Sequence, residues 1–282
     1  MKLNHEKAEI YIPDGINSTQ ALERTTHLAI GAHHDDLEIM AIDGILKCFQ
    51  RPEMWFSGVV VTDGSGSPRA GVYADYSDEQ MKAVRHAEQK KAAYLGDYAA
   101  QVFLSFPSLV VKDVDSRESI DDLVTIIKAT KPQVVYTHNL ADKHLTHIAV
   151  AVRTIQALRE LPPDQRPEEV YGCEVWRALD WVMDDEKIVF NCSQQTHMQA
   201  ALLGVFDSQV SGGKRYDLAA LGRRRANATF YASHDTDDAS GLAYAMDLTP
   251  LIKDDNLDIR RYVQEFIDRF AHNVNNMIAS VI

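Results

Sequence analysis

Short apolar runs alternate with longer segments of helical periodicity over roughly the first 160 residues. Four runs are typical of buried strands, because they are apolar or β-branched and end at polar turns: residues 27–32, 57–62, 101–106 and 133–138. Apolar residues at helical spacing mark the segments between and after them: 37–49, 78–95, about 120–127 and 144–158. This alternation predicts an α/β fold, a Rossmann-like and mainly parallel sheet with helices on both faces.

The rest of the chain departs from this regular pattern. A proline-rich, charged loop at 160–170 precedes two shorter strand candidates, 174–179 and 187–192, and then helices. The last helix, at 256–280, has one apolar face that we expect to pack on the core; a subunit interface, and therefore a homo-oligomer, is the alternative. We expect one domain over residues 1–282, with a helical elaboration from about 211 to 282.

Charge and composition argue against several classes of protein. The formal net charge is −12, so we expect neither nucleic acid nor an anionic membrane as a partner. The three cysteines form no C-x-x-C pair, and neither a signal peptide nor a long apolar run is evident, which predicts a cytoplasmic protein without a membrane span. The glycine-rich segment at 62–68 fits no nucleotide-binding spacing, which disfavours a nucleotide-binding protein.

Histidine and aspartate residues cluster after two of the predicted strands. His33 and Asp36 lie three residues apart directly after the strand at 27–32, and His144 and His147 lie three apart at the start of a helix. Ligands of parallel sheets bind at the carboxyl ends of the strands, where both pairs are expected. A catalytic zinc ion needs about three nitrogen or oxygen ligands, which His33, Asp36 and His147 would supply. Asp35 and His144 remain available for proton transfer.

The same segments resemble a known family. "GAHHDDLE" (31–38) resembles the A-H-P-D-D-E signature of the LmbE-like (PIG-L) family of zinc-dependent N-acetyl-sugar de-N-acetylases, and "DKHLTHIAV" (142–150) resembles its H-x-D-H-x-A segment. Further segments resemble family landmarks in the same order between about residues 27 and 210: "VVVTDGSGS", "RHAEQKKAAYLG", "YGCEVWRAL" and "ALLGVFDSQ".

The resemblance implies a role for each matching residue. His33, Asp36 and His147 would be the zinc ligands. Asp35 would be the general base on the attacking water, and His144 the group that polarises the carbonyl or protonates the leaving amine. These roles suit amide hydrolysis, because zinc lowers the pKa of bound water to about 7 and a nearby carboxylate can accept its proton. Two alternatives stay open. Asp35 could cap the next helix and have no catalytic role, and a divalent ion other than zinc could bind.

Other segments are candidates for substrate contact. Arg85 matches the arginine of the family's R-x-x-E segment, which implies binding of polar groups on the substrate. His234 lies in the acidic segment 233–241, which is either a lid over the pocket or a solvated loop. The basic segments 212–217 and 223–225 either bind a phosphate or carboxylate of the substrate or form salt bridges on a helix face.

The resemblance predicts a zinc-dependent hydrolase. It would remove an N-acyl group, acetyl in the family, from a small-molecule amino-sugar conjugate such as one of N-acetylglucosamine. The sequence departs from the family pattern at His34, Leu37 and Thr146, and Met246 stands near a position where a carboxylate is expected. Thr146 and Met246 motivate the alternative, a family member that binds metal and sugar with little turnover.

Overall fold

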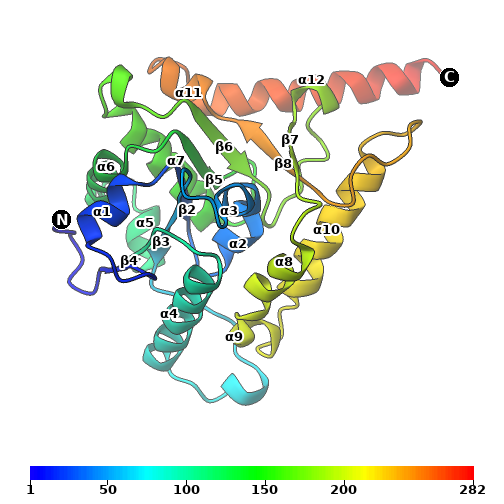
Figure 1. Cartoon of the computed structure of the whole chain (residues 1–282). Helices are drawn as coiled ribbons and strands as arrows, with labels where there is room; N and C mark the ends of the chain where they lie inside the picture. The colour runs from blue at the N-terminus through cyan, green and yellow to red at the C-terminus, as the bar shows by residue number, and fades with distance from the viewer.

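The computed structural model describes residues 1–282 and contains one eight-stranded sheet with helices on both faces (Figure 1). The sheet order is β1-β4-β3-β2-β5-β6-β8-β7, in which β4, β3, β2, β5 and β6 are parallel and β1 and β8 are antiparallel to their neighbours. The strands are β1 (Glu9–Tyr11), β2 (His27–Gly31), β3 (Phe56–Thr62), β4 (Ala100–Phe106), β5 (Val134–His138), β6 (Glu169–Cys173), β7 (Ile188–Asn191) and β8 (Leu242–Asp247). The predicted Rossmann-like α/β fold is therefore confirmed.

Helices connect the strands and cover the sheet (Figure 1). They are α1 (Ser18–Glu23), α2 (Asp36–Met40), α3 (Ile42–Cys48), α4 (Asp78–Leu95), α5 (Ser108–Lys112), α6 (Glu118–Thr130), α7 (Leu145–Arg159), α8 (Thr196–Gly204), α9 (Asp207–Val210), α10 (Tyr216–Phe230), α11 (Pro250–Lys253) and α12 (Ile259–Ala279). Three short 3₁₀ turns lie at Gly71–Tyr73, Pro163–Gln165 and Asp184–Glu186. No helix is both long enough and apolar enough to cross a lipid bilayer.

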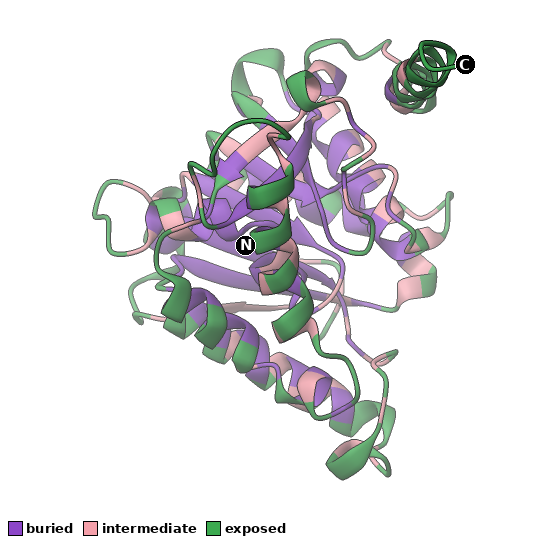
Figure 2. Cartoon of the chain, turned by 90° about the vertical axis from the view of Figure 1, so that its right-hand side faces the viewer, coloured by how far each residue is buried: buried purple, intermediate pink, exposed green.

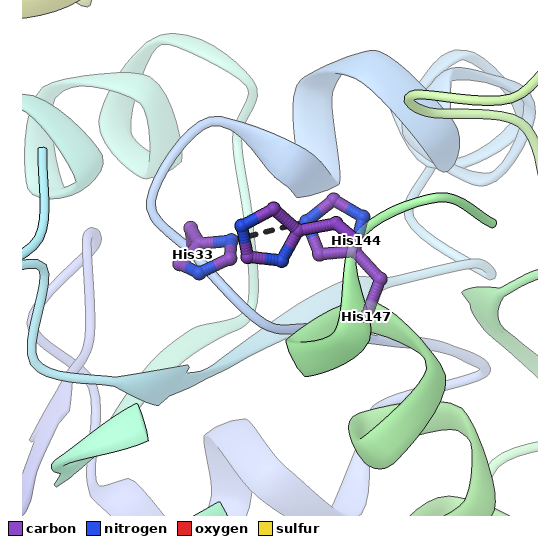
Figure 3. Close-up of side chains that lie close together, drawn as sticks. All are labelled: His33, His144 and His147. Carbon is purple, nitrogen blue, oxygen red and sulfur yellow. Dashed lines mark hydrogen bonds between the residues drawn. The ribbon is translucent and has the colours of Figure 1, made fainter. Parts of the chain in front are cut away.

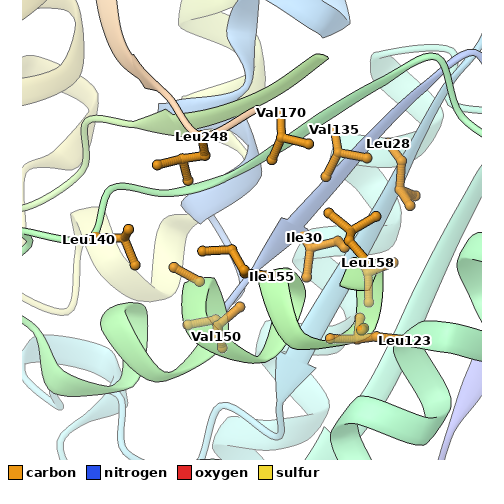
Figure 4. Packing of buried hydrophobic residues seen from close by; sticks show 14 of the residues in the cluster. Leu28, Ile30, Leu123, Val135, Leu140, Val150, Ile155, Leu158, Val170 and Leu248 are labelled. Carbon is orange, nitrogen blue, oxygen red and sulfur yellow. The ribbon is translucent and has the colours of Figure 1, made fainter. Parts of the chain in front are cut away.

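Two apolar clusters fill the space between the sheet and its two helical layers. Successive strand residues point to opposite faces, so Leu28 and Ile30 of β2 join one cluster and Ala29 joins the other. Figure 4 shows the first cluster, in which the strand residues Leu28, Val135 and Val170 face the side chains of α7 such as Leu158. The second cluster is built with α2, α3, α4 and α8. Burial on both faces explains why the central strands read as continuous apolar runs.

The strand order reverses at β2. After β2 the chain builds β3 and β4 on one side of it, and then crosses to place β5 and β6 on the other side. In an open parallel sheet this reversal leaves a crevice at the carboxyl ends of the two strands beside it, here β2 and β5. The loops that follow β2 and β5 therefore meet, although more than 100 residues separate them in sequence, as in the contact between His33 and His147 with |i−j| of 114.

Three sequence-based expectations about elements were wrong. The helix expected at 37–49 is split into α2 and α3 at Ala41, whose backbone (φ −102°, ψ 26°) is not helical. The strand expected at 174–179 is a loop, which Glu174 closes by accepting a hydrogen bond from the Leu179 N–H. The segment 211–282 is not only helical, since its strand β8 lies inside the sheet between β6 and β7.

The expectation that the last helix packs its apolar face on the core was wrong for most of its length. Phe266 is the one buried residue of α12, at 6% exposure, whereas Phe270 is 38% and Met277 62% exposed. Figures 1 and 2 show α12 running outward from the sheet to the C-terminus, with most of its surface exposed. Only the first half of the helix therefore contributes to the core.

Candidate metal centre and active site

The turn between β2 and α2 supplies three of the candidate residues. The His33 backbone N–H donates a hydrogen bond to Oδ2 of Asp36 (2.6 Å), which closes the turn. Between them, Asp35 adopts the left-handed backbone conformation, with φ at 92°. Such a residue costs about 1–3 kcal/mol and persists only where neighbours hold it. One such contact is the Asp35 N–H, which donates to Oε1 of Gln89 on α4 (3.1 Å).

The loop after β5 supplies the other two residues. His144 is the N-cap of α7, and its N–H donates to Oδ1 of Asp142 (2.9 Å). His147 lies in the first turn of the helix, so it projects on the same side as His144. Figure 3 shows both imidazoles directed towards His33 from the start of α7. The structure therefore brings the two predicted clusters together.

Three donor atoms form a compact triangle. Nδ1 of His33 lies 3.1 Å from Nε2 of His147 and 3.3 Å from Oδ2 of Asp36 (Figure 3 shows the first contact). The third edge, from Nε2 of His147 to Oδ2 of Asp36, is 3.5 Å. Tetrahedral zinc binds nitrogen and oxygen at about 2.0–2.2 Å, which separates its ligand atoms by roughly 3.3–3.6 Å. The donor set and its spacing therefore fit a zinc ion.

His138 is a further imidazole beside Asp36, and no motif in the sequence marked it. Its Nε2 lies 3.4 Å from Oδ2 of Asp36, so Asp36, His138 and His147 form a rival triad. However, the same Nε2 accepts a hydrogen bond from the Ala32 N–H (2.9 Å), which engages the lone pair that a metal would need. His138 instead stacks on His147, with ring centroids 3.9 Å apart. We therefore assign it to support of His147.

The protonation state of His147 and the carboxylate near its second ring nitrogen both suit a metal ligand. Burial lowers the pKa of His147 to about 4, so its imidazole is neutral at pH 7 and its lone pair is free to bind a cation. Oδ2 of Asp142 lies 3.6 Å from Nδ1 of the same ring, just beyond hydrogen-bonding distance. Metal-bound imidazoles commonly donate their second N–H to such a carboxylate. Burial also lowers the pKa of His144.

Asp35 does not cap the helix that follows it. Its carboxylate makes no hydrogen bond to the backbone of α2 and instead faces Arg85, with Oδ2 3.1 Å from Nη2. Burial raises the pKa of Asp35 to about 6, against the opposing effect of the Arg85 charge. The capping alternative is therefore not what the structure shows, and the carboxylate stays available to the cavity that it lines.

Arg85 is buried, with 1% of its surface exposed. Its guanidinium also donates to the His34 carbonyl and to Oγ of Ser208 (3.3 Å) and lies 3.7 Å from a carboxylate oxygen of Glu88. These contacts occupy the guanidinium with protein groups, although part of Arg85 lines the cavity. The geometry suits support of Asp35 better than the substrate contact suggested by the sequence.

A cavity of about 570 Å³ adjoins the triangle: His33 and Asp36 line it, whereas His147 is fully buried and does not. His33, Asp35, Asp36, His144 and Thr146 all line it. A volume of this size accommodates a small-molecule ligand.

Two residues considered in the sequence analysis lie away from the cavity. His234 is in the exposed loop between α10 and β8 and does not line the cavity, so the structure does not bring it to the other candidates. Met246 is fully buried in the apolar core on β8 and is not part of the cavity wall. The absence of a carboxylate at Met246 therefore does not alter the lining of the cavity.

Two supporting residues were missed or underestimated from sequence. His138 is the last residue of β5, and its place at the carboxyl end of a central strand was a usable signal. Asp142 is the second supporting residue. It accepts hydrogen bonds from the N–H groups of His144 (2.9 Å) and Trp176 (3.0 Å), which ties the β5 and β6 loops together.

One family model matches part of the chain. Residues 28–158 match the family model described as "PIG-L: GlcNAc-PI de-N-acetylase", so the predicted family resemblance is confirmed. The matched segment contains the triangle and both residues assigned to proton transfer. No curated protein sequence matches the chain.

Several solved structures share the fold. N,N'-diacetylchitobiose deacetylase from Pyrococcus horikoshii has 17% identity and a TM-score of 0.57 over 78% of this chain and 83% of that chain. A deacetylase of the teicoplanin biosynthesis pathway has 14% identity and a TM-score of 0.54 over 79% and 98%. GalB, a 4-carboxy-2-hydroxymuconate hydratase from Pseudomonas putida KT2440, has 14% identity and a TM-score of 0.57 over 79% and 96%. At these identities the likeness establishes the fold, and the reaction must be argued from the site.

Proposed function

Residues 28–158 form a PIG-L (LmbE-like) domain, and we propose that the protein is a divalent-metal-dependent amide hydrolase that removes an N-acetyl group from an amino-sugar conjugate. The metal is zinc in this proposal, and His33, Asp36 and His147 hold it. The main support is the triangle of donor atoms with edges of 3.1, 3.3 and 3.5 Å, two of whose residues, His33 and Asp36, line the cavity. The deacetylases among the structural neighbours support the reaction class.

The chemistry requires a stronger nucleophile and a better leaving group than water and an amide provide. A bound zinc ion would supply Lewis acidity, which polarises the acyl carbonyl and makes water more acidic. Asp35 accepts a proton from water while the water oxygen attacks the carbonyl carbon. Asp35 then passes this proton to the nitrogen as the C–N bond breaks, which yields acetate and a free amine. One carboxylate thus serves as base and then as acid.

His144 and Arg85 assist from two sides. The ring of His144 lies beside His33, with centroids 4.9 Å apart, and lines the cavity; its Nδ1 is buried, whereas its Nε2 makes no hydrogen bond within the protein. A ring N–H of His144 is therefore free to donate to the carbonyl oxygen as negative charge develops there, the polarising part of its predicted role. Arg85 fixes the carboxylate of Asp35, which lies on the same cavity wall.

The direct test is release of acetate from N-acetylglucosamine and N,N'-diacetylchitobiose. We expect zinc-loaded protein to release acetate and a primary amine in equal amounts, chelation to abolish the reaction and added zinc to restore it. The proposal is wrong if the zinc-loaded protein leaves both N-acetyl sugars intact and neither binds. A hydratase activity, which the fold of GalB makes conceivable, would add water without forming a primary amine.

Thr146 supports a second candidate, a sugar-binding protein with little turnover. It occupies a position where the family motif has a carboxylate, and it lines the cavity with 2% exposure. Calorimetric binding of the two N-acetyl sugars without acetate release would favour this candidate.

A further inference from the structure

Three cationic side chains converge on the cavity from separate parts of the fold. Lys112 is the last residue of α5, Lys214 lies in the turn before α10, and Arg223 lies on α10 itself. All three line the cavity that also contains the candidate metal centre. Its only lining carboxylates are Asp35 and Asp36, which belong to the site already described. These three cavity-lining cations, one from α5 and two from α10 and the turn before it, are together called the cationic wall below.

None of the three cations has an ion-pair partner. Their basic neighbours are satisfied differently: Arg215 pairs with Asp217 at 2.7 Å, and Arg224 is buried and donates to the backbone carbonyl of Glu38. The salt-bridge alternative for the two basic segments therefore does not describe Lys214 or Arg223. The chain has 41 acidic and 29 basic residues, so pairing partners are plentiful elsewhere. Three unpaired cations around one cavity are a local reversal of the overall charge.

Direct contacts hold two of these cations at the cavity. Arg223 donates from Nη1 to the carbonyl of Val175 (2.5 Å), which fixes the guanidinium against the loop after β6. Nζ of Lys214 lies 5.0 Å from the centre of the Trp176 ring, and Trp176 itself lines the cavity and is 36% exposed. An exposed indole beside cations offers a flat apolar surface next to an anion-binding one.

We propose that the cationic wall is an anion subsite, so that the N-acylated substrate carries a carboxylate or phosphate group remote from the amide. This inference rests on the proposed function for its orientation, because the acyl group must face the triangle while the anion faces Lys112, Lys214 and Arg223. The wall attracts an anionic ligand towards a protein whose overall charge would repel it.

Three matched conjugates test the proposal: the 2-hydroxyethyl, 2-carboxyethyl and 2-phosphoethyl glycosides of N-acetylglucosamine. Half-exposed ion pairs each contribute roughly 1.4- to 5-fold in binding, so we expect about a tenfold higher kcat/KM for an anionic conjugate over the neutral one, through KM. This preference should fall as salt concentration rises. The carboxylate and phosphate arms show which anion the wall prefers.

Charge-removing variants assign the preference to the wall. In the double variant Lys112→Gln/Lys214→Gln, and separately in Arg223→Gln, the ratio of kcat/KM for anionic over neutral conjugates should fall towards one. Arg225→Gln is the matched control, because Arg225 is exposed on the same helix and does not line the cavity. A ratio, unlike a rate, is insensitive to partial loss of folded protein.

Binding of the same glycosides to the zinc-loaded protein, measured by calorimetry, separates this proposal from the proposed function. If no conjugate is hydrolysed but the anionic ones bind more tightly in a wall-dependent way, the subsite stands and the deacetylase assignment fails. Equal kcat/KM and equal affinity for neutral and anionic conjugates would overturn the subsite. A preference that survives loss of all three cations would overturn it too.

Discussion

Asp35 and Asp36 are adjacent in sequence but face different partners. The left-handed backbone of Asp35 directs its carboxylate to Arg85, whereas the carboxylate of Asp36 points to the imidazoles of His33 and His147. One carboxylate can therefore bind a metal while its neighbour stays free for proton transfer. This separation depends on a strained residue, which the contacts to Gln89 and Arg85 hold in place.

Substitution of the two aspartates should consequently affect different properties, turnover for Asp35 and zinc binding for Asp36. We expect Asp35→Asn to retain about one zinc per chain and to lose about 10²- to 10⁴-fold in kcat, because the side chain keeps its shape but no longer accepts a proton. Asp36→Ala should instead lose zinc, as measured by mass spectrometry of the metal content. Asp164→Asn, an exposed substitution, is the control. Turnover at the native rate by Asp35→Asn would show that another group is the base.

Arg85 should act on kcat rather than on KM. We expect Arg85→Lys to lower kcat about 10- to 100-fold with KM nearly unchanged, because lysine keeps the charge but cannot hold both Asp35 and Glu88 in the same geometry. Arg85→Gln should also destabilise the fold by about 3–5 kcal/mol, since it leaves a buried carboxylate unpaired. A rise in KM at constant kcat would support the substrate-binding role suggested by the sequence.

Sequence spacing indicated which site side chains lie close together, but less clearly which way they point. The order of motifs predicted that His33, Asp36 and His147 lie close together, because the carboxyl ends of neighbouring strands in a parallel sheet converge. It did not show that Arg85 points inward to Asp35, nor that His234 lies on an exposed loop away from the cavity. Those outcomes depend on packing between segments distant in the chain, which local patterns do not encode.

At the scale of elements, α12 divides into a packed and an exposed part. We expect Phe266→Ala to lower the free energy of unfolding by about 3–5 kcal/mol and Phe270→Ala by less than about 1 kcal/mol, because only Phe266 leaves a cavity. Denaturant unfolding followed by circular dichroism measures both. Equal losses that depend on protein concentration would instead place Phe270 in contact with a second copy of the chain.

Elements with strong local signals were predicted, and elements that depend on their neighbours were not. The helix expected at 78–95 is α4 (Asp78–Leu95), where the Ser77 N-cap and Gln80 form a capping box. By contrast, β8 (Leu242–Asp247) contains no β-branched residue, so its sequence carries little strand preference. It is a strand because β6 and β7 pair with it on both sides.

At the scale of the whole molecule, the sheet topology creates the site. Because the strand order reverses at β2, the loops after β2 and β5 meet over one crevice, and α5 and α10 add cations around the same cavity. An acidic chain thereby surrounds a cavity with a local excess of positive charge. The fold alone accommodates more than one reaction, so the chemistry depends on what occupies the triangle.

The claim that His33, Asp36 and His147 bind zinc is tested most directly by anomalous X-ray diffraction from zinc-loaded crystals, recorded on both sides of the zinc absorption edge. The account predicts a single strong anomalous peak within about 2.0–2.2 Å of Nδ1 of His33, Oδ2 of Asp36 and Nε2 of His147. A peak bound elsewhere, or no peak in the presence of excess zinc, would contradict the metal centre and the hydrolase built on it.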